Sequence, residues 1–563
     1  MSSPRSFRGP GARPGVIPRA IVATSTVLFA YLWFQNSWVG EDAYITGRTV
    51  WNVLHGYGLR WNVVERVQTY THPLWMLLLV ALQAVFRDFH WAAIALSLLC
   101  NGLLLVAVRR LAGMTKAGAR LFGLFVLALA GSRAFFDFTS SGLENPLTSL
   151  LLVVFVLVGQ KPASPHRSTL LVLVASLVFL NRMDAILLLA PAIAGLLLVE
   201  ARRIVGQCEP HRWVRTILRW VGRLALAAAP AWLWLAFSVF YYGFPFPNTA
   251  YAKLSTGVGR MALDTQGLAY VRHTVNHDPL TPFVILFATA FVPWLAVRRK
   301  AWLPALLALG LPVQCAYVVS VGGDFMGGRF FSPAFSLALA LLLLEARESC
   351  AGADTSRVRV ALVVAAAILI AQAALLPHGP IRTFVSYRNF ETDDYGIADE
   401  KGYYHNRSSL GVRLFRQTDF FPSHRFVAEG LKFRAQSAPV TVECNVGYFG
   451  YYAGPSKLVI DECGLTDPFL SRLPADPLSR IGHFIRPVPL GYPDAVLSGD
   501  ASRLADPALR QPYAELVEIT RGPLLSLSRL RRIARWNLDH PLTATLAVTS
   551  ARDPAAKGVV TPP

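Results

Sequence analysis

The chain has 563 residues, of which 53% are hydrophobic and only 16% are charged, well below the roughly 25% charged residues of a typical soluble domain. This balance excludes an ordinary soluble protein and indicates a polytopic α-helical membrane protein. The net charge of +20 would suggest a nucleic-acid partner in a soluble protein, but Lys and Arg cluster here between apolar segments, so membrane topology explains them better and no nucleic acid is predicted.

Apolar segments follow one another along the first two thirds of the chain, and several approach the ~20 residues needed to cross a hydrocarbon core of ~30 Å. Arginines at positions 5, 8, 13 and 19 precede the first segment and predict an uncleaved signal-anchor with a cytoplasmic N terminus. The twelve segments are 20–38, 73–86, 91–108, 121–136, 146–159, 168–181, 185–199, 224–242, 282–297, 301–321, 330–346 and 360–377.

The second segment decides the topology, because its 14 residues are few for a membrane span. If 73–86 crossed the membrane, the basic loops at 109–120 and 298–300 would face outward, against the positive-inside rule. If it stays in the outer interface, about 11 segments cross and these loops face the cytoplasm. The sequence therefore predicts a fold of about 11 transmembrane helices, with 146–159 and 168–181 kept as short spans.

This topology places the polar loops on one side, together with the C-terminal part of the chain. The predicted division is a transmembrane catalytic domain, 1–377, and an extracytoplasmic domain, 378–563. Short strands are predicted at 440–442 and 458–460, so the second domain is expected to contain a small α/β unit. Cys444 and Cys463 bracket this unit, and a disulfide between them suits an extracytoplasmic location, although the sequence leaves their pairing open.

The acidic pair Glu41-Asp42 directly follows the first segment, at the depth where a lipid-linked donor presents its anomeric carbon. A carboxylate there can serve acid–base chemistry, so both acids are predicted catalytic residues. The stretch 43–55 is predicted to be an interfacial helix with Tyr44 and Trp51 in the headgroup zone. The alternative is a helix N-cap acid that the helix dipole stabilises.

Four basic residues flank segments on the predicted outer side, where a phospho-lipid leaving group needs positive charge. They are His72, Arg182, Lys253 and Arg329. All four are predicted to bind the substrate, and so are the acids Asp184 and Asp324. The alternative is that each basic residue anchors a lipid headgroup or pairs with one of these two acids.

Other outward segments supply polar groups for a sugar. Glu144-Asn145 is predicted to bind sugar hydroxyls, or else to begin the helix that continues through Pro146. Asn248 lies in an aromatic and polar stretch, 245–253, that is a candidate for substrate contact. The four glycines of 322–329 let the backbone approach a ligand closely, although a tight interhelical turn would use them too.

Some patterns are absent from the sequence. No Walker or GxGxxG pattern follows a predicted strand, and few charges lie inside the spans, which disfavours ATP-driven and proton-coupled transport. No CxxC or zinc spacing is present. No cofactor is indicated, and the sequence leaves a divalent metal ion open.

An acidic pair after the first span, followed by an interfacial helix, resembles the GT-C glycosyltransferases, which use polyprenyl-phosphate sugars. The finer motifs resemble the mycobacterial and corynebacterial terminal arabinofuranosyltransferases of the AftB type. These motifs are ERVQTYTHPLW (65–75), SGLENPLT (141–148), NRMD (181–184), NTAYAK (248–253), GGDFMGGR (322–329), GLTDPFLSRLP (464–474) and IGHFIRPVPLGY (481–492).

The resemblance implies a decaprenyl-phospho-arabinofuranose-like donor, a glycan acceptor and a C-terminal domain that helps to hold the acceptor. The GT-C pattern is often Asp-Asp, whereas Glu41 stands first here, which favours Asp42 as the catalytic acid. The sequence thus predicts a glycosyltransferase that moves a pentofuranose, D-arabinofuranose by the resemblance, to an envelope glycan at the outer face of a bacterial cytoplasmic membrane.

Three alternatives remain open at this stage. The donor sugar could instead be mannose or aminoarabinose, or the acceptor could be a protein. A lipid or polysaccharide flippase is a further alternative, although a flippase should carry polar residues through several spans and open to both faces. The sequence does not choose between an inverting and a retaining reaction.

Overall fold

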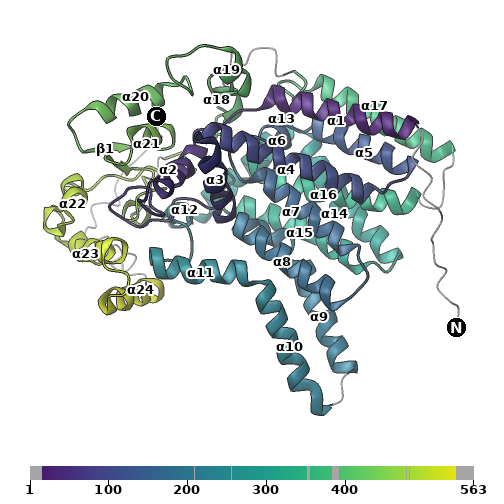
Figure 1. The fold of residues 1–563 in the computed structure, drawn as a ribbon, viewed down its shortest axis with the longest axis horizontal. Helices are drawn as coiled ribbons and strands as arrows, with labels where there is room; N and C mark the ends of the chain where they lie inside the picture. The colour runs from purple at the N-terminus through teal and green to yellow at the C-terminus, as the bar shows by residue number, and fades with distance from the viewer. Residues whose placement is uncertain are drawn as a thin grey trace.

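The computed structural model describes residues 16–207, 210–254, 256–350, 356–382, 392–476, 479–480 and 482–539. Arg5, Arg8 and Arg13, on which the predicted signal-anchor orientation depends, lie outside the described residues. Within the described ranges the chain folds into a bundle of apolar helices, with the C-terminal elements gathered at one end of it (Figure 1).

A helix is observed in each of the twelve predicted apolar segments, and the bounds of the bundle helices follow. They are α1 Val16–Asn36, α3 Pro73–Phe86, α4 Phe89–Ala112, α5 Lys116–Ala130, α7 Asn145–Gly159, α8 Pro165–Asn181, α9 Ala190–Gln207, α11 Ala229–Tyr242, α14 Leu280–Arg298, α15 Trp302–Ser320, α16 Ser332–Cys350 and α17 Ser356–Leu375. Short helices connect them, namely α2 Ala43–Leu54, α6 Arg133–Phe136, η1 Met183–Leu188, η2 Pro210–Arg212, α10 Trp213–Ala227, α12 Asn248–Leu254, α13 Arg260–His277 and η3 Arg329–Phe331.

Local signals in the sequence set the helix ends. The Asp88 side chain caps α4 by accepting a hydrogen bond from the backbone N–H of Trp91 at 3.0 Å, and Gly113 ends the helix at a positive φ of 84°. Arg109 and Arg110 occupy its last turn, where the helix dipole favours positive charge. The long apolar run between these signals accounts for the longest helix of the bundle.

Among the described helices, five are long and apolar enough to cross a membrane: α1, α4, α14, α15 and the stretch Arg329–Cys350. The pair α10 and α11 would make a sixth span if its 66° bend lies within one crossing. Pro73–Phe86, Asn145–Gly159, Pro165–Asn181 and Arg359–Leu375 are apolar but shorter. The chain is therefore a membrane protein, while the predicted total of about 11 spans remains a prediction.

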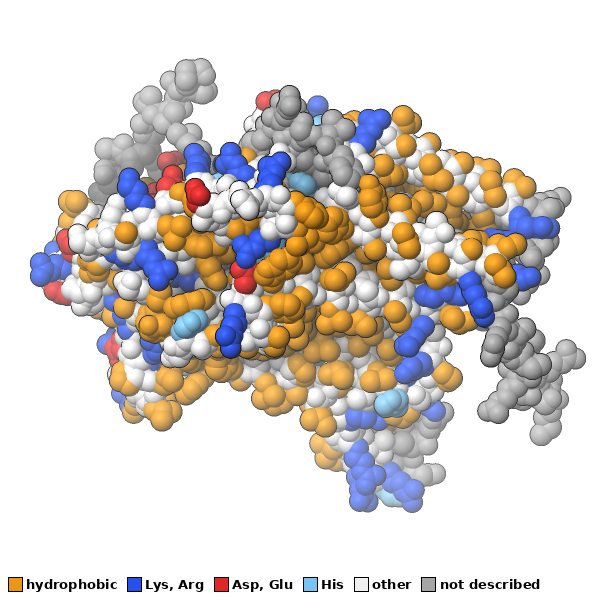
Figure 2. All heavy atoms as spheres, turned by 45° about the horizontal axis from the view of Figure 1, so that its top comes forward, with side chains coloured by type: hydrophobic (Ala, Val, Ile, Leu, Met, Phe, Trp, Pro, Cys, Tyr) orange, Lys and Arg blue, Asp and Glu red, His pale blue; other side chains and the backbone are white. Residues whose placement is uncertain are grey.

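Charged and apolar side chains occupy different regions of the surface (Figure 2). Figure 2 shows a broad hydrophobic surface over the helix bundle. Lys and Arg lie at the end of the bundle far from the C-terminal elements, at the tip below it, and also over the C-terminal elements (Figure 2). The apolar surface of the bundle thus lies between basic regions at its two ends (Figure 2).

The C-terminal part contains the predicted small α/β unit. Strands β1 (Val440–Glu443) and β2 (Leu458–Asp461) pair in parallel, with Val440 opposite Leu458. Cys444 and Cys463 form a disulfide directly after them. The remaining elements are α18 Glu400–Ser408, α19 Leu410–Phe415, α20 Arg425–Ala435, α21 Tyr448–Ala453, η4 Leu470–Arg472, α22 Tyr492–Ser498, η5 Ala501–Arg503, α23 Pro507–Arg521 and α24 Leu527–Asp539.

Helix α2 joins the bundle to the C-terminal part. The predicted helix at 43–55 is observed at Ala43–Leu54, and nine of its 12 residues are buried. Tyr44 is 1% exposed and contacts Tyr448 and Phe89, each with ring centroids 4.8 Å apart. The predicted position of Tyr44 in the headgroup zone is therefore wrong, because the C-terminal helix α21 covers this face of α2.

Candidate active site

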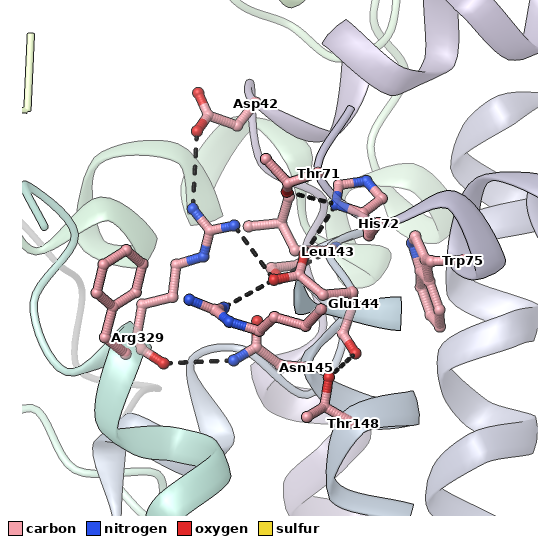
Figure 3. Close-up of polar contacts among 12 residues, drawn as sticks. Asp42, Thr71, His72, Trp75, Leu143, Glu144, Asn145, Thr148 and Arg329 are labelled. Carbon is pink, nitrogen blue, oxygen red and sulfur yellow. Dashed lines mark hydrogen bonds and ion pairs between the residues drawn. The ribbon is translucent and has the colours of Figure 1, made fainter. Parts of the chain in front are cut away.

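The side chain of Arg329 lies where carboxylates from three separate loops converge. Figure 3 shows two of them, Asp42 and Glu144, with their contacts to Arg329. Its Nη1 is 3.9 Å from Asp42 Oδ2 and 3.6 Å from Asp324 Oδ2, and its Nη2 is 3.5 Å from Glu144 Oε1. Gly328, at φ 76°, turns the backbone so that Arg329 begins η3 with its side chain 10% exposed. The structure thus brings together four predicted site residues from three separate stretches of the sequence, since Asp324 and Arg329 share one loop.

Asp42 is the accessible carboxylate of this group. Its side chain is 23% exposed, against 0% for Asp324 and 1% for Glu144. It precedes α2 in the N-cap position, yet its side chain makes no capping hydrogen bond within the described structure, so the N-cap alternative is not supported. Burial raises the pKa of Asp42, while Arg329 and Lys253 act to lower it.

Glu41 points toward the C-terminal part. Its Oε1 accepts hydrogen bonds from the backbone N–H groups of Gly447 at 2.5 Å and Tyr448 at 3.0 Å, and the residue is 5% exposed. Burial, followed by the neighbouring Asp42, raises the pKa of Glu41 well above its ordinary value. These contacts tie α21 to the start of α2 and leave Asp42 as the acid that faces open space.

Glu144 and Asn145 support Arg329 from below (Figure 3). Glu144 receives Arg182 Nη1 at 2.7 Å and lies 3.1 Å from His72 Nδ1, and Asn145 Nδ2 donates to the backbone carbonyl of Arg329 at 3.4 Å. Burial alone would raise the pKa of Glu144, but Arg329, His72 and Arg182 hold it well below its ordinary value. Both residues are buried; Glu144 contacts the guanidinium of Arg329, and Asn145 holds the backbone of Arg329.

The predicted cations differ in how many carboxylates they contact and in how exposed their side chains are. Arg182 is bound by Glu144 and by Asp184, whose Oδ1 lies 3.0 Å from Nε, and its guanidinium lies 4.7 Å from the centre of the Phe330 ring. Arg182 therefore pairs with Asp184, which was the alternative to substrate binding that the sequence left open. Lys253 is less enclosed, because its Nζ is 3.6 Å from Asp324 Oδ1 and its side chain is 29% exposed.

Asn248 serves the fold instead of facing a substrate. Its Nδ2 donates to the backbone carbonyls of Gly464, Leu465 and Asp467 at 2.9, 3.2 and 3.0 Å. Its Oδ1 accepts from Ser471 and Arg472. The residue is 5% exposed, so the contact predicted for a sugar or lipid is replaced by a link between α12 and the C-terminal part.

Three residues of the C-terminal part join this region and were not predicted: Glu400, Arg480 and His483. Burial, and next the charge of Asp42, raise the pKa of Glu400 to about 8. Arg480 and His483 flank Phe325, the neighbour of Asp324. The one signal in the sequence was that His483 lies in the motif stretch 481–492. The sequence could not show that this stretch contacts Phe325, because the two are far apart along the chain.

The carboxylates of the site do not form an evident metal centre. Among the described residues, no group of three or more His, Cys, Asp or Glu side chains is arranged to hold a metal ion. Asp42, Asp324 and Glu144 instead share one guanidinium. The arrangement supplies an accessible base beside positive charge, which suits transfer of a group from a phosphate leaving group.

Comparison with known proteins identifies two relatives, although no family model matches the sequence. The chain is 27% identical over 545 residues to a terminal β-(1→2)-arabinofuranosyltransferase of Mycobacterium tuberculosis, which covers 82% of this chain and 83% of the relative. It is 28% identical over 387 residues to the enzyme of the same name from Corynebacterium glutamicum, which covers 61% of this chain and 54% of the relative. The resemblance to AftB-type enzymes seen in the sequence motifs is confirmed.

Solved structures with a similar arrangement are more distant. ArnT from Cupriavidus metallidurans aligns with a TM-score of 0.45 and 17% identity, over 80% of this chain and 87% of that chain. The oligosaccharyltransferase of Archaeoglobus fulgidus aligns with a TM-score of 0.44 and 12% identity, over 79% of this chain and 64% of that chain.

Proposed function

We propose that the protein is a membrane glycosyltransferase that moves D-arabinofuranose from a polyprenyl-phosphate carrier to a cell-envelope glycan. Two relatives named for arabinofuranosyl transfer support the donor sugar, one of them over most of its length. The observation that carries the proposal is the position of Asp42, whose partly exposed carboxylate lies 3.9 Å from the guanidinium of Arg329.

The site supports a direct displacement at the anomeric carbon. In an inverting reaction Asp42 removes the proton of the acceptor hydroxyl, and the hydroxyl oxygen of the acceptor forms a bond to the anomeric carbon as the bond from that carbon to the phosphate oxygen breaks. Burial raises the pKa of Asp42, which makes it a stronger base than an ordinary aspartate. In a retaining reaction Asp42 would instead contact the sugar as a nucleophile or ion-pair partner. The anomeric configuration of the product distinguishes the two.

The leaving group is a polyprenyl phosphate, which departs as a stable anion and therefore needs charge stabilisation more than a proton. Arg329 and Lys253 supply positive charge beside Asp42. The proposal places the active site and the C-terminal part at the outer face of the cytoplasmic membrane of a bacterium, with the C-terminal part holding the glycan. It includes no cofactor.

The Asp42→Asn variant tests the proposal. The purified protein in detergent is incubated with labelled polyprenyl-phospho-arabinofuranose and a glycan acceptor, beside the mannose and aminoarabinose donors. We expect Asp42→Asn to reduce transfer at least about 100-fold, because loss of a positioned base typically costs 10²–10⁴ in rate.

The matched control is Asp264→Asn, since Asp264 is 42% exposed and pairs with Arg260 on the surface of α13. Near-normal turnover in Asp42→Asn would refute the role of this acid. Transfer in detergent, without a sealed compartment, also excludes a protein that only flips lipid. Preference for another donor sugar would reassign the substrate.

A further inference from the structure

Three basic side chains surround the ring of Phe325, which follows Asp324 in the glycine-rich loop. Lys253 Nζ lies 5.8 Å and the Arg480 guanidinium 5.6 Å from the ring centroid, and the His483 ring centroid lies 4.1 Å from it. Phe325 itself is 5% exposed. Lys253 of α12 and Arg480 of the C-terminal part thus place positive charge around the same ring.

Much of the hydrogen-bonding capacity in this group is unused. Arg480 Nε and Nη2 and His483 Nδ1 are buried, and they have no hydrogen-bond partner among the described residues. Arg182, in contrast, is bound by two carboxylates. A buried polar atom without a partner costs about 1–3 kcal/mol, so native structures seldom keep one unless a ligand or water completes it.

The charges of the group are also incompletely balanced. Burial, and then Arg480 and Lys253, lower the pKa of His483 to about 4. Asp324 is shared between Lys253 and Arg329, at 3.6 Å from each. Glu400, Asp324 and Asp393 act on Arg480 from nearby, but burial and Asp42 raise the pKa of Glu400 to about 8, which disfavours its charged form. An added anion would therefore be attracted to this place.

The place is also adjacent to the proposed base. Asp42, Arg329, Asp324 and Lys253 form a chain of contacts in which each step is 3.6–3.9 Å. In a donor whose anomeric carbon faces Asp42, the phosphorus is two bonds from that carbon, so the phosphate is close enough to Asp42 for the cations of this chain of contacts to reach it. Guanidinium groups bind phosphate oxygens well, because two N–H groups can donate in parallel.

We propose that Arg480, together with Lys253 and His483 around the Phe325 ring, binds the phosphate of the polyprenyl carrier. The C-terminal part then completes the donor site, in addition to any contact with the glycan. This inference rests on the proposed function and deepens it by naming the phosphate ligands.

The test measures binding of decaprenyl phosphate to the full-length protein in detergent. We expect Arg480→Gln to weaken binding at least about tenfold, because a hydrogen bond to a charged group is lost, and Arg480→Lys to keep part of the affinity. Neutral decaprenol should bind equally to all variants. The matched control is Arg503→Gln, since Arg503 is 63% exposed and pairs only weakly with Asp500 at 3.8 Å.

Equal binding of decaprenyl phosphate by wild type and Arg480→Gln would overturn the inference. A loss that extends to decaprenol would also overturn it, because Arg480 would then merely shape a lipid groove. Thermal unfolding of each variant identifies those that fail to fold, and His483→Gln provides a second variant with an expected smaller loss in the same direction. If phosphatidylglycerol competes as well as decaprenyl phosphate, the site belongs to bilayer headgroups and the inference fails.

Kinetics separate this inference from the proposed function. We expect Arg480→Gln to raise KM for the donor and to leave KM for the acceptor unchanged, and the reverse result would assign Arg480 to the glycan. If the wild type binds decaprenyl phosphate through Arg480 but transfers no sugar from any donor, the phosphate site stands and the proposed reaction falls.

Discussion

At the scale of single residues, the site consists of three carboxylates that contact the guanidinium of one arginine. Arg329 is approached by Asp42, Asp324 and Glu144, and their exposure separates their roles. The two buried acids hold the arginine in place, whereas the exposed acid can meet a substrate. The sequence predicted all four residues from their place beside spans, but it could not predict which acid remains accessible, because that depends on packing between distant loops.

The pH dependence of transfer should report the environment of Asp42. A general base works only when it is deprotonated, so kcat/KM should fall as the pH drops through the pKa of Asp42. Burial raises this pKa while Lys253 lowers it, so Lys253→Gln should move the acid limb of the profile to higher pH. The measurement is kcat/KM against pH for both proteins. An acid limb that stays in place, or moves to lower pH, would contradict Asp42 as the titrating base.

Glu144 should matter for stability as much as for activity. Glu144→Gln removes the charge that Arg182 and Arg329 share at 2.7 and 3.5 Å, leaving two buried guanidinium groups undercompensated. Breaking a buried ion pair from one side costs about 3–5 kcal/mol. We expect a clearly lower unfolding temperature by differential scanning fluorimetry, with Asp264→Asn as the surface control. Unchanged stability would mean that water or a lipid replaces the carboxylate.

At the scale of elements, the contact between α2 and α21 couples the catalytic loop to the C-terminal part. Arg48 donates hydrogen bonds to the backbone carbonyls of Gly450 and Lys457, each at 2.7 Å, and Glu41 receives the N–H groups at the start of α21. Since Asp42 adjoins Glu41, movement of α21 would carry the base with it. The sequence predicted a helix at 43–55, but it did not predict the burial of this helix by a segment 400 residues away.

Gly447→Ala tests this coupling. A Cβ at Gly447 would lie 2.1 Å from the backbone oxygen of Glu41, so α21 must move away from α2. We expect transfer to fall at least about tenfold, because a small displacement of a catalytic group can cost as much as 10²-fold in rate. Gly411→Ala is the matched control, since a Cβ there meets nothing within 4 Å. Normal transfer by Gly447→Ala would show that Asp42 does not depend on α21.

At the scale of the whole molecule, the polar loops and the C-terminal part share one end of an apolar bundle (Figure 1). The disulfide between Cys444 and Cys463 lies at that end, and disulfides persist in oxidising compartments. The disulfide is the feature through which the proposed location of this end outside the cytoplasm can be tested.

The disulfide gives a direct measurement of sidedness. In intact cells, a membrane-impermeant thiol reagent should label the protein strongly only after reduction, because Cys444 and Cys463 then become free on the outer side. The variant with both residues changed to Ser is the control for the other cysteines. Equal labelling of the control, or labelling only after the membrane is opened, would contradict an external C-terminal part.

The sequence by itself determined the membrane class, the helical segments, the two strands and the residue types at the site. These follow from local physics, since apolar runs must satisfy their backbone within helices and alternating short runs pair as strands. Only the tertiary structure decided that Asn248 is a structural link, that Tyr44 is covered and that Arg480 approaches Phe325. Such contacts join residues more than 150 positions apart, and hydrophobic periodicity carries no information about which distant loops will meet.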